Sequence, residues 1–260
     1  MRQDVRAPFD DALRRARISA FGPGEFVDQE GFMRAREILA LAVEAGVGPG
    51  VSVLDLCCGV AGPGRLVTRE LGCEYTGVDY SADAVDIARE RAGDLPCRFE
   101  VSRVPPVPQG PFDVVLLLET MLAFPDKESL LREVSSALRP GGRFAFTLEE
   151  GRPLDEGERE RMPDADTVWP VPLADMLAYL ERAGLRVRWR GECTRTHRAT
   201  VDSVTRALVA EEPRIAARLG RRPLDELLAA HRLWSDWLRV GRVRKFAFVT
   251  EKTATVEVSR

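Results

Sequence analysis

Short apolar runs alternate with amphipathic segments along the chain from residue 51 onward. The run FDVVLLL is apolar on both faces, as a central parallel strand requires. The strands predicted in this way are residues 51–56, 74–80, 97–101, 112–118 and 143–148. Helices are predicted between them at residues 62–71, after Ser81 and at residues 127–138, the last stopped by Pro140-Gly141-Gly142. This βαβα alternation predicts a parallel sheet with helices on both faces.

The two ends of the chain follow a different pattern. Near the start, Asp28 is predicted to cap a helix that contains Phe32 and ends near residue 46. In the last third, a helix at residues 173–184 is followed by two strands at 185–193 and 245–252, with a helical stretch between them that breaks near Pro213 and Pro223. The predicted organisation is an N-terminal helical segment or lid, residues 1–46, and a Rossmann-like sheet domain, residues 47–260, with a helical insert at about 198–240.

Composition and charge narrow the possible partners. The formal net charge is −3, which argues against a nucleic-acid polymer, because such binding needs a basic surface. The start of the sequence lacks the apolar run of a signal peptide, and no stretch reaches the length of a membrane span, so we expect a cytoplasmic protein with no membrane partner. The five cysteines show no zinc or disulfide spacing, so we expect reduced thiols and no metal site. High Arg and Ala usage suggests a bacterial source, and a monomer or a homodimer is expected.

The segment VLDLCCGVAGPG, residues 53–64, carries the first chemical signal. A strand ends there in a turn of small residues and opens a helix, so backbone N–H groups can approach a polar ligand. About 20 residues further on, the second strand ends at Asp79, whose carboxylate can accept hydrogen bonds from both hydroxyls of a ribose. The turn and Asp79 together indicate a cofactor that contains adenosine.

These segments resemble the class I S-adenosylmethionine-dependent methyltransferases. VLDLCCGVAGPG looks like their first motif, GVDYS like the second, PFDVVLLLETMLAFPD like the fourth-strand motif and LRPGGRFAFT like the turn into the fifth strand, so the resemblance covers residues 51–147. It implies a seven-stranded sheet of order 3-2-1-4-5-7-6 with the last strand antiparallel, and S-adenosylmethionine as the cofactor. The cofactor-binding residues that it implies in the first two motifs are Asp55, Cys57, Gly59, Ala61, Gly62, Asp79 and Tyr80.

A nicotinamide enzyme is the rival interpretation of the same turn. Asp55 opens the turn, and a carboxylate suits a cationic, phosphate-free cofactor but repels a pyrophosphate. The Pro-Gly-Gly turn before the fifth strand also favours the methyltransferase.

The sequence departs from the family pattern at several positions. Cys57 and Ala61 replace glycines, and a positive φ at Cys57 would be costly. After the third strand, where many relatives have an acidic residue that contacts adenine, this chain has Ser102 and Arg103. Ala123 stands where many relatives have a histidine after the fourth strand. Glu119, at the end of that strand, is a candidate to orient the substrate, to act as a base or to contact the sulfonium region; the alternative is a carboxylate that binds nearby backbone.

Two histidines and several aromatic residues are candidates for the substrate side. His231 shares a helix face with Trp234 and is either a core residue or a substrate contact and catalytic residue. His197, which has arginine neighbours, is expected at the surface. The remaining substrate-pocket candidates are Phe124, Trp169 and Trp234. A late basic cluster, Arg242, Arg244 and Lys245, is expected to be a solvated strand edge rather than an anion site.

The sequence therefore predicts methyl transfer from S-adenosylmethionine to a small molecule, with S-adenosylhomocysteine as the second product. The acceptor atom is an oxygen, a nitrogen or a carbon. A specialised metabolite fits best, since the predicted cap is apolar and aromatic. Two alternatives stay open. One is a cyclase-like protein that binds S-adenosylmethionine as a scaffold, and the other is a non-catalytic subunit.

Overall fold

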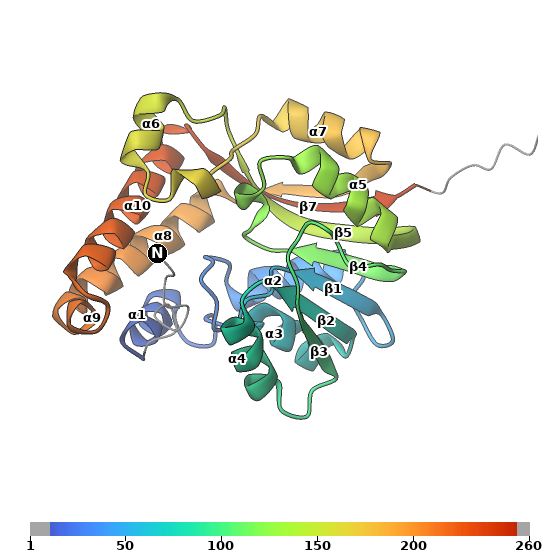
Figure 1. Ribbon diagram of the computed structural model, residues 1–260, viewed down its shortest axis with the longest axis horizontal. Helices are drawn as coiled ribbons and strands as arrows, with labels where there is room; N and C mark the ends of the chain where they lie inside the picture. Colours follow the sequence, from blue (N-terminus) through green and yellow to red (C-terminus); the bar gives the residue numbers. More distant parts are fainter. Residues whose placement is uncertain (1–10, 254–260) are drawn as a thin grey trace, which may run out of the picture.

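The computed structural model describes residues 11–253 and contains one seven-stranded sheet (Figure 1). Its strand order is β3-β2-β1-β4-β5-β7-β6, with β7 antiparallel to both of its neighbours and the remaining neighbours parallel. The predicted order and the antiparallel strand are thereby confirmed. The strands are β1 (Ser52–Leu56), β2 (Glu74–Asp79), β3 (Cys97–Val101), β4 (Phe112–Leu117), β5 (Leu138–Glu150), β6 (Leu185–Glu192) and β7 (Arg244–Lys252).

Helices cover both faces of this sheet. On one face, buried residues of α2 (Ala35–Glu44), α3 (Gly62–Leu71) and α4 (Ala82–Ala92) pack with the outward side chains of the central strands in a single apolar cluster. On the other face, α5 (Lys127–Ala137) and α7 (Leu173–Arg182) pack in a second cluster that includes stacked Phe144, Phe146 and Phe248. Since helices cover both faces of β1 and β4, a ligand cannot reach the faces of the central strands. In sheets of this kind ligands bind at the carboxyl ends of the strands.

A group of helices gathers at one end of the sheet (Figure 1). α8 (Thr194–Ala210), α9 (Glu212–Leu219) and α10 (Arg221–Val240) lie between β6 and β7 in the chain, and α1 (Asp11–Phe21) packs on them through a third apolar cluster. Leu154 and Met162, which flank the short α6 (Glu156–Arg161), pack with α8 and α10 in a fourth cluster. Pro213 stands in the first turn of α9 and Pro223 in the first turn of α10, where a missing N–H is tolerated.

Some element boundaries differ from the prediction for local reasons. The helix predicted after Asp28 begins only at Ala35, with Arg34 as its N-cap, so Asp28 is not a cap and Phe32 lies outside the helix. Asp28 instead has a left-handed backbone (φ 53°) in a turn-rich segment. β5 begins earlier than predicted, at Leu138, and its pairing with β4 shifts register between Phe112 and Val114.

The contact between Gly64 and Tyr75 generates a stability prediction. A Cβ at Gly64 would lie 2.1 Å from a ring atom of Tyr75, which is fully buried, so Gly64→Ala forces overpacking. We expect the free energy of unfolding to fall by about 1–3 kcal/mol. Gly48→Ala is the matched control, because nothing described lies within 4 Å of its Cβ position, and it should change the value by less than about 0.5 kcal/mol. Denaturant unfolding measures both, and equal values for the two variants would contradict the packing argument.

Candidate functional site

The turn after β1 is held in a sequence of left-handed backbone conformations. Cys57, Gly59 and Ala61 have φ values of 59°, 54° and 54°, so two of the three positions carry a side chain where glycine is normally preferred. The turn is fixed by hydrogen bonds from Cys58 N to Val78 O (3.0 Å) and from Ala61 N to Cys58 O (2.8 Å). Nothing described lies within 4 Å of the side-chain position at Gly59, so the turn has open space on that side.

Asp79 stands beside this turn at the end of β2. Its Oδ2 accepts a hydrogen bond from Gly59 N (2.9 Å), and its Oδ1 accepts one from Ser81 N (2.9 Å). Each oxygen keeps a further lone pair for a ligand hydroxyl. The two features that the sequence singled out therefore meet in space.

Asp55 is oriented differently from what the sequence suggested. Its carboxyl is buried and accepts a hydrogen bond from the Tyr75 hydroxyl at 2.6 Å, inside the sheet rather than at the turn. Burial raises the pKa of Asp55 to about 7, so the group is not the fixed negative charge that the sequence argument assumed. Because its carboxyl is bound to Tyr75, Asp55 does not provide the repulsion of a pyrophosphate that the sequence suggested.

The edge beyond Asp79 carries the other expected contacts. Ser102 N donates to Asp79 O (2.8 Å), which places the residues after β3 beside the end of β2. The Arg103 guanidinium lies 5.7 Å from the ring centre of Tyr80, which is 65% exposed. Tyr80, Ser102 and Arg103 thus share one exposed patch next to the turn.

Residues 27–33, which we call the strap, cross the carboxyl edge from α3 to the end of β4. A Cβ at Gly62 would lie 1.4 Å from Val27 O, and a Cβ at Gly31 would lie 2.7 Å from Glu119 Cγ, so the strap touches both ends of this path. Buried Arg17 of α1 donates to the carbonyls of Gln29 and Glu30, at 3.2 and 2.7 Å. The strap is therefore bound to α1 as well as to the sheet edge.

Asp28 provides the ionic anchor of the strap. Its carboxylate pairs with Arg14 of α1 (2.7 Å), Arg65 of α3 (3.4 Å) and Arg91 of α4 (3.7 Å). These arginines, with a hydrogen bond from Arg14, lower the pKa of Asp28 despite its partial burial. The residue predicted to cap a helix instead joins three helices.

A buried ion cluster lies where β4 and β5 end and the antiparallel β7 begins. Lys245 is fully buried on β7, and its Nζ pairs with Glu119 Oε1 at 2.7 Å and with Glu149, its cross-strand neighbour on β5. Glu119 Oε2 accepts a hydrogen bond from the strap at Phe32 N (2.9 Å), and Thr147 Oγ1 lies 3.3 Å from Oε1. Burial opposes ionisation of Glu119, but Lys245 prevails and lowers its pKa to about 2. With two carboxylates against one ammonium, the cluster is net negative.

The late basic residues are thus not a solvated edge. Lys245 is completely buried in this cluster, Arg242 is paired with buried Glu158 (2.6 Å), and Arg244 is paired with Glu150 (2.7 Å). The prediction failed because each of these cations faces a carboxylate that is distant in the sequence. Lys245 pairs with carboxylates at the ends of both β4 and β5, Glu119 and Glu149.

Both histidines are buried in the described structure, which corrects the surface assignment of His197. His197 stands in the first turn of α8 and is 6% exposed, with Nδ1 3.9 Å from Glu119 Oε2. His231 lies on α10, and its buried Nδ1 has no hydrogen-bond partner among the described residues. The ring of Phe32 packs edge-on against both imidazoles, with centroid distances of 5.4 and 5.3 Å.

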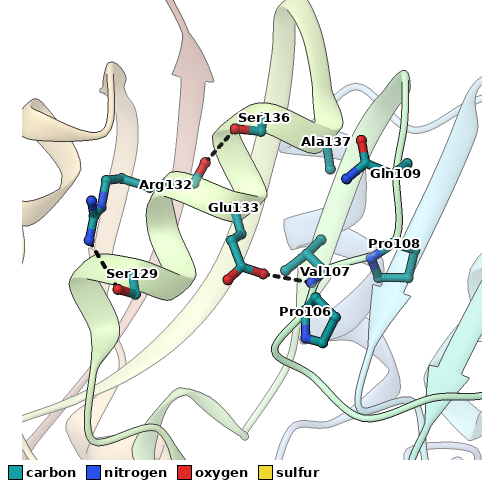
Figure 2. Close-up of a pocket in the computed structure, with 9 residues that line it drawn as sticks. All are labelled: Pro106, Val107, Pro108, Gln109, Ser129, Arg132, Glu133, Ser136 and Ala137. Atoms are coloured by element: carbon teal, nitrogen blue, oxygen red, sulfur yellow. Dashed lines mark hydrogen bonds between the residues drawn. The ribbon is translucent and has the colours of Figure 1, made fainter.

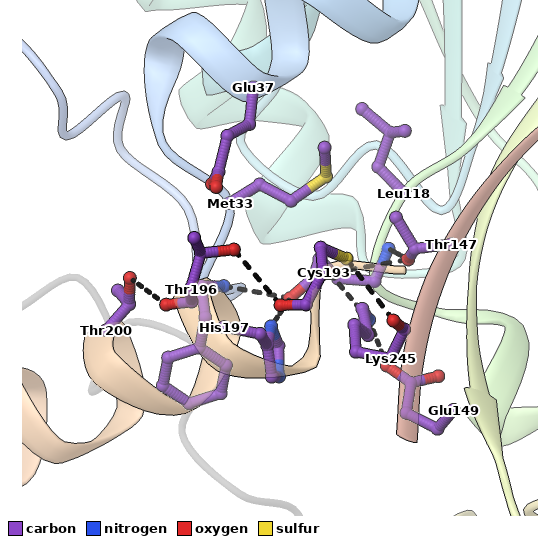
Figure 3. Close-up of polar contacts among 12 residues, drawn as sticks. Met33, Glu37, Leu118, Thr147, Glu149, Cys193, Thr196, His197, Thr200 and Lys245 are labelled. Carbon is purple, nitrogen blue, oxygen red and sulfur yellow. Dashed lines mark hydrogen bonds and ion pairs between the residues drawn. The ribbon is translucent and has the colours of Figure 1, made fainter. Parts of the chain in front are cut away.

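The elements that converge on this cluster are distant in sequence (Figure 3). His197 and Cys193 enter from the start of α8, Thr147 and Glu149 from β5, and Lys245 from β7, below Met33 of the strap. Cys193 N donates to Lys245 O (2.8 Å), and Lys245 N donates to Thr194 Oγ1 (3.0 Å), so the start of α8 is fixed to β7. This pairing delivers His197 to the end of β4.

The aromatic substrate candidates separate in the structure. Phe124 is buried in the core cluster between the sheet and α5, so its side chain is not available to a substrate. Trp169 donates from Nε1 to Asp166 O (2.8 Å) and lies 4.3 Å beneath the Arg159 guanidinium. Trp234 packs with Trp237 in the cluster that also contacts Phe32, and it therefore remains beside the strap.

The two thiols in the turn are not activated nucleophiles. Burial raises the pKa of Cys57 to about 12 and also raises the pKa of Cys58 well above its usual range, with the nearby carboxylates adding to the effect. Both thiols therefore stay protonated at neutral pH. Cys58 packs closely against Gly77 on β2, so it serves as a small packing residue beneath the turn.

A cavity of about 400 Å³ lies elsewhere in the fold (Figure 2). It is lined by the loop at residues 106–109 and by one side of α5, where Glu133 accepts a hydrogen bond from Val107 N (2.7 Å). None of its lining residues belongs to the turn, the strap or the ion cluster. Between residues 11 and 253 there is no helix with the length and apolarity to cross a membrane and no group of three candidate metal ligands.

Comparisons with known proteins agree with this geometry. Residues 53–142 match a family model described as "Methyltransferase domain". The chain is 32% identical over 106 residues to Methyltransferase GfsG of Streptomyces halstedii, covering 38% of each chain. It is 33% identical over 147 residues to 27-O-demethylrifamycin SV methyltransferase of Amycolatopsis mediterranei, covering 52% of this chain and 54% of that one. The chain thus spans less than two thirds of the length of these curated relatives.

A solved structure extends the likeness to almost the whole chain. The 4+2 cyclase SpnF superposes with a TM-score of 0.74 at 20% identity, covering 94% of both chains. The fold of the chain is that of the class I S-adenosylmethionine-dependent methyltransferases. The family match over residues 53–142 lies within this fold and contains both the β1 turn and Asp79.

Sequence reasoning missed Lys245, Thr147 and the position of His197. Thr147 and Lys245 both lie within strands that the pattern predicted, residues 143–148 and 245–252, and inward alternation on the last strand was the available signal. For His197 the sequence contains no comparable signal, because only the pairing of Cys193 with β7 decides where α8 begins.

The ion cluster generates a prediction on stability. Lys245→Met leaves Glu119 and Glu149 buried without a cation, so the free energy of unfolding at pH 7 should fall by about 3–5 kcal/mol. The pKa of Glu119 is depressed in the folded protein, so its contribution is present above its unfolded value of about 4.5 and is lost as the pH falls toward 2. The deficit of the variant should therefore shrink below pH 4.5.

Lys252→Met is the control on the same strand. Lys252 Nζ donates to Leu138 O rather than to a carboxylate, so its loss should cost only about 1 kcal/mol. Urea unfolding of both variants across pH 3–8 measures these differences. A deficit in Lys245→Met that does not depend on pH would contradict the ionic origin.

Proposed function

We propose that this protein transfers a methyl group from S-adenosylmethionine to a small-molecule acceptor. The observation that carries the proposal is the joining of the β1 turn to Asp79 through the Gly59 hydrogen bond, at the carboxyl edge of a sheet of this class. When bound, S-adenosylmethionine supplies an electrophilic methyl group on a sulfonium. The family match to residues 53–142 and the names of the curated relatives support the same activity.

The residues at the edge fit the chemical parts of this cofactor. Asp79 would hold the ribose hydroxyls, because its two oxygens lie at the turn and keep free lone pairs. The backbone of Cys57, Gly59, Ala61 and Gly62 would line the turn, where Gly59 leaves open space. Tyr80, Ser102 and Arg103 form the patch in which the adenine would lie. Their assignment rests on proximity to Asp79.

The ion cluster suits the end of the cofactor that carries the sulfonium, away from the ribose and the adenine. Glu119 stands at the end of β4 in a net negative group, and such a group attracts a cation such as a sulfonium or an ammonium. A pyrophosphate, as in a nicotinamide dinucleotide, would be repelled there. The preference against a pyrophosphate therefore comes from Glu119 and not from Asp55.

The acceptor would bind between the strap and the helices α8 and α10. His231 offers a buried Nδ1 with no partner among the described residues, and a buried polar atom of that kind is stabilised by a ligand hydrogen bond. Phe32 and Trp234 border the same place with apolar surface. A polar group carried on an apolar or aromatic metabolite matches this combination.

Calorimetric titration tests the cofactor assignment first. Wild-type protein should bind S-adenosylmethionine and S-adenosylhomocysteine and should give no signal with NAD. Asp79→Ala removes charge-assisted hydrogen bonds of about 1.5–3 kcal/mol each, so its affinity for S-adenosylhomocysteine should fall by at least tenfold. Asp86→Ala, which changes an exposed carboxylate on α4, should leave the affinity unchanged. Equal affinities for the two variants would remove Asp79 from the site.

His231→Gln tests the acceptor side. The variant should bind S-adenosylhomocysteine like the wild type, because His231 lies on α10 and away from the turn, while its turnover with a screened acceptor should fall by about tenfold or more. Release of S-adenosylhomocysteine measures turnover and also separates methyl transfer from cyclase-like chemistry, which releases none. Unchanged turnover with a lower melting temperature would make His231 a core residue.

A further inference from the structure

His197 has a partner that suits a base rather than a packing residue. The side chain is 6% exposed, and its Nδ1 faces Glu119 Oε2 at 3.9 Å. Burial lowers the pKa of His197 to about 4, so the imidazole is neutral at pH 7. A neutral imidazole carries its proton on one nitrogen and leaves the other as an acceptor. The nitrogen without the proton is the one that can act as a base.

The Glu119 carboxylate determines which nitrogen of His197 carries the proton. Glu119 is held ionised by Lys245 and is further oriented by Phe32 N and Thr147. A carboxylate that faces Nδ1 favours the tautomer with the proton on Nδ1, which leaves Nε2 bare on the other side of the ring. The separation of 3.9 Å is longer than a hydrogen bond, and such contacts often shorten only when substrate is bound.

The surrounding charges keep this imidazole neutral at rest. Glu119 favours protonation of His197, whereas Lys245 on β7 and burial oppose it. Two further titratable groups lie close by. The Cys193 thiol is kept protonated by burial, and His231, which packs against the same Phe32 ring, is neutral because burial lowers its pKa to about 3. A proton taken up by His197 would therefore be stabilised by one carboxylate directly behind the ring.

We propose that His197 is the general base for the acceptor, that Glu119 positions it, and that the acceptor atom is the oxygen of a hydroxyl group. This inference rests on the proposed function and names its acceptor class. The proton of the hydroxyl moves to His197 Nε2 as the oxygen–methyl bond forms. The carbon–sulfur bond of the donor breaks, and its electron pair stays on sulfur.

A hydroxyl is the acceptor that such a base serves best. It can donate a hydrogen bond to the bare Nε2 before the reaction, and its oxygen becomes a strong nucleophile only as the proton leaves. A neutral amine needs no base at the transition state, and a C–H group makes no comparable hydrogen bond to a base. Phe32 of the strap packs edge-on against both His197 and His231, so one aromatic ring contacts both imidazoles.

Nitrogen NMR of the imidazoles tests the tautomer directly. The chain contains two histidines, so the spectrum of protein labelled with 15N-histidine holds two rings, which His197→Gln and His231→Gln assign. In wild-type protein saturated with S-adenosylhomocysteine at pH 7.5, we expect the proton of His197 on Nδ1 and a bare Nε2. In Glu119→Gln, with Lys245 still paired to Glu149, the two tautomers should mix.

Millimolar phenol, with toluene as its matched control, tests the acceptor class in the same sample. Phenol should shift the Nε2 resonance of His197 upfield by several ppm, and toluene should not. A proton on Nε2 in the wild type, an unchanged tautomer in Glu119→Gln, or no response of Nε2 to phenol would each overturn the inference.

Calorimetry with S-adenosylhomocysteine on the same labelled protein separates the two levels of failure. Absence of binding would refute the proposed function itself. Normal binding together with a proton on Nε2, or with an Nε2 resonance that phenol does not shift, would refute the role of His197. The proposed function would remain intact in that case. The tautomer is read from the wild-type protein, and because the chain has two histidines, either histidine variant that folds is enough to assign both rings.

Discussion

The pairing of Lys245 with two buried carboxylates is the interaction on which the arrangement of the edge depends. It joins the ends of β5 and β7 through Glu149 and the end of β4 through Glu119, and Glu119 in turn receives the strap. A fully buried ammonium is tolerable only with such partners, because desolvation of an unpaired charge is very costly. Strand register, strap and α8 are therefore all specified around one cation. The polar cluster defines which elements meet, and the apolar clusters on either side of the sheet supply most of the burial.

The sheet and the turn were predictable because their signals are local. Each central strand is an apolar run, and Asp79 follows its strand at a fixed distance from the turn, so chain order alone brings them together. Lys245 and His197 were not predictable for the opposite reason. A lysine or histidine with arginine neighbours resembles a surface residue until the carboxylate that faces it, 78 to 126 residues away in the sequence, is known. The prediction that the Asp55 carboxylate faces the turn was wrong for the same reason, since its partner Tyr75 lies on the next strand.

The N-terminal strap shows how far a local rule can mislead. Asp28 precedes a helical pattern and has the side chain of a cap, yet three arginines from α1, α3 and α4 compete for its carboxylate more strongly than the helix N–H groups do. The strap therefore couples the cofactor edge to α1, which itself packs on α8 and α9. Two of its anchors are backbone carbonyls bound by buried Arg17, so its path depends on that arginine more than on the strap sequence.

The left-handed backbone at the edge has a consequence for protein engineering. Among the described residues, Asp28, Cys57, Ala61, Glu119 and Asp164 have positive φ without being glycine, and all but Asp164 border the cofactor edge. Each such position costs on the order of 1–3 kcal/mol. A screen for thermostable variants would therefore favour glycine at Cys57 and Ala61, where a side chain of little chemical use is retained. At Asp28 and Glu119 the same replacement would remove the carboxylate that the strain supports, so selection for heat resistance and selection for activity would diverge there.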